Sequence, residues 1–181
     1  MLQTMAGQFE DAEESLLATL DFTSSGNPLT VYGLAILYEA QDRLDDAGHW
    51  MVEGFKAMGR KITEPASVEE IVMRVSPHVL LQAMFALVAA RSGATSVAKE
   101  CLEVMLACKA KSANFPALAI ALALTGMGRF DEAVKCLHDA AFEQSEPLVM
   151  WFHIFPPLRH LHGHKGFGQL LEKLKLTPQR S

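Results

Sequence analysis

Residues 119–141, AIALALTGMGRFDEAVKCLHDAA, consist of two runs of helical character separated by a glycine turn. Gly128 precedes Ala133 by five positions, and a leucine follows that alanine by four. Glycine adopts the positive φ that ends one helix and redirects the chain. Asp131 and Glu132 favour the first turn of the second helix, where the macrodipole is positive. The stretch therefore predicts a helix–turn–helix unit, with alanine at the point where two helices cross.

Three other segments repeat this pattern. Their turn residues are Gly7, Asp42 and Gly93, and their crossing alanines are Ala12, Ala47 and Ala98. One helical turn after each alanine stands a large apolar residue: Leu16, Met51 and Leu102, which correspond to Leu137 in residues 119–141. Turn residues at 7, 42, 93 and 128 differ by 35, 51 and 35 residues. Amphipathic helices are predicted upstream of the complete turns, over Leu29–Ala40, Val79–Arg91 and Asn114–Gly126, with small residues at Ala35, Ala86 and Ala121.

This pattern resembles the tetratricopeptide repeat (TPR) family, whose helix–turn–helix unit is about 34 residues long. The resemblance covers residues 1–145 and implies an all-α, right-handed superhelical solenoid of antiparallel helix pairs. Its repeats are a truncated first repeat at 1–24 and repeats near 28–59, 79–108 and 114–145. The tryptophan that the family prefers early in the first helix is replaced by Val31, Gln82 and Ala117. Because the first repeat is short, we expect the chain to begin inside a repeat of a longer protein.

The longer interval between the second and third turns places an insert at 60–78. Within it, Ser67-Val68-Glu69-Glu70 reads as a capping box that opens a short helix to about Val75. Pro77 prevents continuation of that helix. The insert is predicted to be an extra helix or an extended loop.

The repeat pattern stops near residue 145, and residues 146–181 are predicted to form capping helices and a tail. Phe167, Leu170, Leu171 and Leu174 share one helical face. The apolar residues of this tail resemble those that close TPR regions in bacterial signalling proteins, such as adenylyl cyclases and transcriptional activators. That family usually has Asp-Pro-Arg before the phenylalanine, where this chain has His164-Lys165-Gly166. The resemblance implies a regulatory parent protein and a tail that covers the last repeat.

Composition narrows the functional classes. The chain has a formal net charge of -5 and a pI of about 5.8. It has no Lys/Arg-rich run, which argues against nucleic-acid binding. The most apolar segments, Val79–Ala90 and Phe115–Leu124, are shorter than the roughly 20 residues that a membrane span needs. No signal peptide is recognised at the start, so we expect a cytoplasmic protein without a membrane partner.

No arrangement of residues predicts catalysis. The carboxylate pairs Asp45-Asp46, Glu69-Glu70 and Asp131-Glu132 are interpreted as first-turn helix charges. Residues 24–28 read as an inter-repeat turn, because they lack the strand and glycine spacing of a nucleophile elbow. There is no phosphate-binding glycine loop. The sequence therefore predicts a non-enzyme with no catalytic residues and no cofactor.

Histidines and cysteines leave a metal or redox role as the alternative. His160, His162 and His164 alternate, with His153 and His138 upstream, and imidazoles that converged could bind zinc or nickel. Alternation by two does not align side chains on a helix, so an exposed loop is the preferred interpretation and no metal site is predicted. The three cysteines cannot all pair and contain no CxxC, which favours buried thiols in a reducing compartment.

In TPR arrays the first helix of each pair lines the concave surface, which the resemblance transfers to this chain. The predicted partner-binding positions are Tyr32, Ile36, Glu39, Met84, Leu87, Arg91, Phe115, Leu118 and Leu122. Arg91 is the one basic residue among them, so a clamp for a peptide carboxylate is not expected. An apolar groove suits an amphipathic segment of a protein or peptide. The competing interpretation is that these positions are core, or are covered by the insert, the tail or a second copy.

Taken with this groove, the sequence predicts a non-catalytic protein–protein interaction scaffold within a larger regulatory protein. The alternative is a self-association module that forms a homodimer through the same face. A metal-binding protein that uses the His-rich tail is the remote third possibility.

Overall fold

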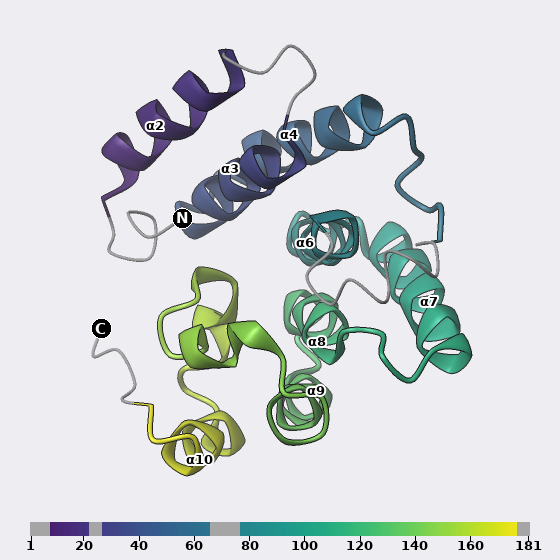
Figure 1. Cartoon of the computed structure of the whole chain (residues 1–181), viewed down its shortest axis with the longest axis vertical. Helices are drawn as coiled ribbons and strands as arrows, with labels where there is room; N and C mark the ends of the chain where they lie inside the picture. The colour runs from purple at the N-terminus through teal and green to yellow at the C-terminus, as the bar shows by residue number, and fades with distance from the viewer. Residues whose placement is uncertain (1–7, 22–26, 66–76, 177–181) are drawn as a thin grey trace.

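The computed structural model describes residues 8–21, 27–65 and 77–176, and these residues form an all-helical fold without a strand. In Figure 1 the helices follow a curved course from α2 at the upper left, past α7 on the right, to α10 at the lower left. The elements are α2 (Phe9–Asp21), α3 (Pro28–Ala40), α4 (Leu44–Ala57), α6 (Pro77–Arg91), α7 (Thr95–Lys111), α8 (Ala117–Gly126), α9 (Phe130–Phe142), the 3-10 helices η1 (Pro147–Trp151) and η2 (Pro156–Leu161), and α10 (Lys165–Lys173). Within the described ranges, no helix is both long and apolar enough to cross a membrane.

Three hairpins, α3–α4, α6–α7 and α8–α9, turn at the predicted residues. Asp42, Gly93 and Gly128 have φ values of 59°, 85° and 71°. This confirms the prediction that these positions reverse the chain in the left-handed region, where glycine carries no Cβ penalty. Gly7, the fourth predicted turn residue, lies outside the described residues.

Small residues lie where the helices cross. The crossing alanines Ala12, Ala47, Ala98 and Ala133 are at most 1% exposed, and the small residues Ala35, Ala86 and Ala121 are fully buried. In each hairpin the two helices pack against each other, and α6 also packs against both α3 and α8. A side chain without bulk beyond Cβ allows these close approaches.

The first helices of the hairpins differ from the prediction in character. All residues from Thr30 to Glu39 of α3 are buried, and so are all from Ala117 to Thr125 of α8. The expected amphipathic pattern is therefore wrong for these two helices, which are covered on every side. A helix that is apolar all round is a buried helix. The second helices α4 and α9 do show one buried stripe, with acidic residues in their first turns.

Two predicted helix starts shift by two or more residues, for local reasons. α8 begins at Ala117 rather than Asn114, after Pro116 in the N-cap position. Its first amides donate to a distant carboxylate: Glu146 Oε1 lies 2.7 Å from the nitrogen of Ala117 and 3.2 Å from that of Leu118. This carboxylate satisfies amides that have no partner within the helix. α6 begins at Pro77 rather than Val79, since proline is well suited to a first helical position.

The insert is described only in part. The predicted capping box and short helix, 67–75, lie outside the described residues. Before them, Gln82 Nε2 of α6 donates to the carbonyls of Ile62 and Glu64, at 3.3 and 2.5 Å. Gln82 is 3% exposed, so the start of the insert is fixed to the buried side of α6.

The C-terminal elements η2 and α10 pack on different parts of the molecule. α10 packs against α9, with Phe167, Leu170 and Leu171 buried on one face, as its spacing predicted. η2, by contrast, reaches back across the molecule and contacts both α8 and α3 (Figure 1). The tail therefore covers far more than the last repeat.

Candidate functional site

We call the nine predicted partner-binding positions the first-helix face. Eight of them are at most 1% exposed: Tyr32, Ile36, Glu39, Met84, Leu87, Phe115, Leu118 and Leu122. The ninth, Arg91, has a side chain that is 18% exposed. None of these positions lies open on the surface in this conformation, as the competing interpretation allowed.

The C-terminal segment contributes to this burial. We call residues 147–161 the docked segment, because η2 within it packs on α3 and α8. Its apolar anchors are inserted fully: Phe152, Phe155, Leu158 and Leu161 are each at most 1% exposed. Proline at 156 and 157 prevents continuation of an α-helix from upstream, so the segment crosses the two helices as short 3-10 turns.

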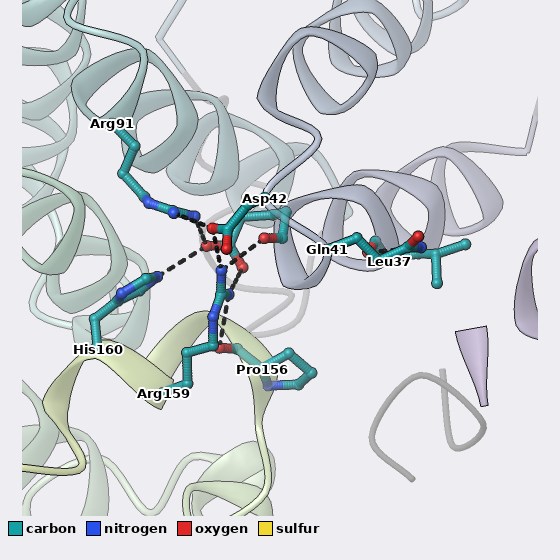
Figure 2. A network of polar contacts seen from close by, with 8 residues as sticks. Leu37, Gln41, Asp42, Arg91, Pro156, Arg159 and His160 are labelled. Atoms are coloured by element: carbon teal, nitrogen blue, oxygen red, sulfur yellow. Dashed lines mark hydrogen bonds and ion pairs between the residues drawn. The ribbon is translucent and has the colours of Figure 1, made fainter. Parts of the chain in front are cut away.

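A polar cluster joins the docked segment to the helices α3 and α6, which belong to the array of hairpins α3–α4, α6–α7 and α8–α9. It consists of Glu39, Asp42, Arg91, Arg159 and His160 (Figure 2). The Glu39 side chain is fully buried at the end of α3. Arg91 of α6 donates from Nη1 to Glu39 Oε1, and Arg159 of η2 donates from Nη1 to Oε2. His160 Nε2 lies 3.1 Å from Oε1.

Asp42 extends the cluster into the turn of the first complete hairpin. Arg159 Nη2 donates to the Glu39 carbonyl oxygen at 2.7 Å and to Asp42 Oδ1 at 3.1 Å. Arg91 Nη2 also donates to Asp42 Oδ1. The hydrogen bond from Arg91 holds the pKa of the Asp42 carboxyl below its ordinary value, with the charge of Arg159 acting in the same direction. Asp42 thus both reverses the chain and accepts from two arginines.

The cluster is a network of paired charges. Each guanidinium bridges both carboxylates with hydrogen bonds. The Glu39 side chain is fully buried, whereas that of Asp42 is 70% exposed, so only the Glu39 end of the cluster lies in a low-dielectric site. Both arginines also lie near helix C-termini: Arg91 ends α6, and Arg159 donates to the last turn of α3. Positive charge is favourable at these ends. The arrangement can therefore hold the cationic side chain of a docked segment against the end of α3.

One buried polar atom on the first-helix face has no partner within the described chain. Tyr32 is fully buried in α3, and its hydroxyl has no hydrogen-bond partner among the described residues. Burial raises the pKa of this phenol well above its ordinary value. Tyr32 lies seven residues before Glu39, two helical turns away on the same side of α3.

The histidines do not form the single exposed loop that the sequence suggested. His162 is exposed and stacks on Phe167 with ring centroids 5.9 Å apart. His160 and His164 are half-buried, and His164 Nε2 lies 3.2 Å from Asp131 Oδ1. Desolvation of its imidazole, reinforced by the nearby His153 and His160, lowers the pKa of His162. In the ranges that the structure covers, no three His, Cys, Asp or Glu side chains converge as a metal would need.

The cysteines occupy separate positions as free thiols. Cys101 and Cys108 are buried, and Cys136 is partly buried. Burial raises the pKa of Cys101 to about 11 and that of Cys136 in the same direction. A high pKa keeps a thiol protonated and unreactive at neutral pH.

Sequence reasoning found Glu39 and Arg91 but missed their partners Arg159 and His160. The available signal was Glu39 itself, a carboxylate in an otherwise apolar helix that is buried throughout. Such a charge is almost always paired, and the pair can be distant in sequence. Arg159 follows it by 120 residues, so no local spacing could identify it.

Comparisons with protein-family models, curated proteins and solved structures gave no match to this chain.

Proposed function

We propose that this chain is a non-catalytic protein-interaction module that binds an apolar or amphipathic segment of a partner on the first-helix face. We further propose that its hairpins form a right-handed, TPR-like solenoid, and that it serves within a larger regulatory protein. The consecutive packing of α3, α6 and α8, each with its own second helix, supports the solenoid.

One observation carries the binding proposal. The helices of this face already accommodate a stretch of polypeptide, because η2 lies across α3 and α8 with its apolar anchors buried. A surface that fits the chain's own apolar segment has the shape and chemistry to fit a similar segment from another protein. In this view the docked segment occupies the face until a partner replaces it.

A displayed peptide library tests the proposal. It is panned against the full chain and against the full-length Arg159→Ala variant, in which the docked segment has lost its main polar contact. Enriched peptides are expected to be apolar or amphipathic, and to bind the variant more tightly than the original chain, because the docked segment competes less well in the variant.

The binding surface is then located by competition. A synthetic peptide with the sequence of residues 147–161 should displace the enriched peptides if they share the first-helix face. Failure to enrich any peptide family, or enrichment of peptides that the competitor does not displace, would contradict the proposal.

A further inference from the structure

Arg159 occupies a site made of three acceptors on the array. These are Glu39 Oε2, the Glu39 carbonyl oxygen at 2.7 Å and Asp42 Oδ1 at 3.1 Å. Two of the three belong to one residue at the end of α3, and the third belongs to the turn that follows. Two nitrogens of a planar guanidinium reach all three, which the compact ammonium of lysine cannot reproduce with the same geometry.

The charges of the site require a cation. Without Arg159, the array would present the carboxylates of Glu39 and Asp42 against the single guanidinium of Arg91. Glu39 is fully buried when a segment is docked beside it, and a carboxylate in that state without sufficient charge compensation is strongly unfavourable. His160 lies on the docked segment beside Arg159, so it would leave together with it. The vacated site therefore favours another positively charged group.

The surroundings restrict what can carry that charge. Phe155, Leu158 and Leu161 flank Arg159 in the docked segment and are buried. The site thus receives its guanidinium from a short segment with large apolar side chains on both sides.

From these contacts we infer that Glu39 and Asp42 form a guanidinium-binding site that recognises an arginine flanked by apolar side chains in a partner protein, a site that Arg159 fills when no partner is bound. The inference rests on the proposed function and names the chemistry of the partner. The expected sequence feature in that partner is an arginine within a few residues of phenylalanine or leucine anchors.

Chemical complementation tests the guanidinium site directly. The full-length Arg159→Ala variant is melted in the presence of millimolar ethylguanidine, with ethylammonium as the matched cation that lacks the planar fork. Ethylguanidine should raise the melting temperature of this variant saturably, and ethylammonium should not. The original chain and an Arg129→Ala variant, which loses an arginine paired with Glu132 on the surface, should show no such increase.

Two further variants keep the test interpretable. Arg159→Gln keeps the side chain as far as Cδ and ends in an uncharged amide that can donate, and it replaces the alanine variant if that variant does not fold. Adding Glu39→Gln to either variant should abolish the effect of ethylguanidine. A response that survives this second substitution, or no saturable response in any folded Arg159 variant, overturns the assignment.

Peptide binding tests the recognition of a partner. A labelled peptide with the sequence of residues 152–162, FHIFPPLRHLH, is titrated against the folded Arg159 variant, beside a peptide in which its arginine is glutamine. The arginine peptide should bind on the order of tenfold more tightly or better, as expected when one member of a hydrogen-bonded charge pair is removed.

The outcomes separate this inference from the proposed function. Equal binding of the two peptides overturns the guanidinium inference but leaves segment binding on the first-helix face intact. If neither peptide binds, both fail. Light scattering that shows a dimer of the Arg159 variant, dissociated by the arginine peptide, overturns the foreign partner and makes a second copy of this chain the occupant.

Discussion

At the scale of single residues, Glu39 has the most demanding environment in the described chain. Its carboxylate is fully buried and contacts Arg91, Arg159 and His160. Bringing a carboxylate into such a site is costly, and close, hydrogen-bonded cations offset that cost. Removing the carboxylate leaves the half-buried guanidinium groups of Arg91 and Arg159 with fewer acceptors. The contribution of Glu39 to stability is therefore measured by the cost of leaving Arg91 and Arg159 without this acceptor.

The first prediction concerns Glu39→Gln, which keeps the shape of the side chain and removes its charge. We expect a loss of about 3–5 kcal/mol in the free energy of unfolding, the usual effect of removing one member of a buried ion pair. Urea denaturation followed by circular dichroism measures it. Glu132→Gln is the matched control, because Glu132 makes an exposed pair with Arg129, and its loss should change stability little. Equal effects of the two substitutions would contradict the assigned role of burial.

At the scale of helices, the crossing of α8 and α6 leaves no room for a side chain at Gly126. Gly126 lies at the end of α8, and a Cβ added to it would lie 2.5 Å from the Leu87 Cα and 2.6 Å from the Leu87 carbonyl oxygen. Both atoms are backbone, so no side chain can rotate away to accommodate a methyl group. A Cβ added to Gly48 of α4, by contrast, would meet no atom within 4 Å.

The second prediction compares alanine at these two glycines. Gly126→Ala should destabilise by about 1–3 kcal/mol, because the added methyl group forces the two helices apart. Gly48→Ala should stabilise by about 0.5–1 kcal/mol, since it removes backbone freedom from the unfolded chain inside a helix. Thermal melts of both variants give the comparison. Stabilisation by Gly126→Ala would show that α6 and α8 cross elsewhere.

Sequence periodicity predicted the hairpins well because it reports local geometry. Asp42, Gly93 and Gly128 reverse the chain as their spacing indicated, and each choice of turn residue follows from backbone sterics. The contact of η2 with α3 has no such local cause. It depends on a pair such as Arg159 and Glu39, separated by 120 residues, and a single sequence contains no signal for which distant charges meet. The same limit explains why the first-helix face was predicted as a groove, although the chain covers it.

The pKa of His162, in the turn between η2 and α10, leads us to expect a lower free energy of unfolding at acidic pH. Desolvation of the imidazole, with the charges of His153 and His160 nearby, lowers the pKa of His162 below its ordinary value of 6.5. When the pH falls below about 6.5, the unfolded chain takes up this proton before the folded chain does, so the free energy of unfolding decreases. The hydrogen bond from Arg91 to Asp42 acts in a separate and more acidic window, below the ordinary value of 3.8.

The third prediction follows from this sign. The urea midpoint should be lower near pH 5 than near pH 7.5, and His162→Gln should reduce that difference, because glutamine takes up no proton. His49→Gln, at an exposed position of α4, is the matched control and should leave the difference unchanged. A midpoint that rises on acidification, or equal effects of the two substitutions, would contradict the role assigned to His162.

At the scale of the whole molecule, the fold closes on itself through its C-terminal segment. α10 packs on α9, while η2 contacts α3 near the other end of the described array (Figure 1). Contacts between the two ends oppose independent unfolding of the terminal hairpins, which contact only their neighbours in an open repeat array. The docked segment therefore couples the stability of the first complete hairpin to that of the last.

The fourth prediction uses the two tryptophans of the chain, which lie on either side of this closure. Trp50 belongs to α4 and Trp151 ends η1, and both pack partly buried against the core. Trp151→Phe leaves a probe of the array, and Trp50→Phe leaves a probe of the docked segment.

Urea transitions followed by fluorescence should coincide in the two variants, because the docked segment and the array unfold as one unit. Adding Arg159→Ala to each should separate them, with the Trp151 signal changing at lower urea, since the segment loses its main polar contact while α3 and α4 keep their own packing. Separate transitions before Arg159 is altered would show that the segment is not part of the cooperative fold. Coincident transitions after that change would show that the apolar anchors alone hold it on the first-helix face.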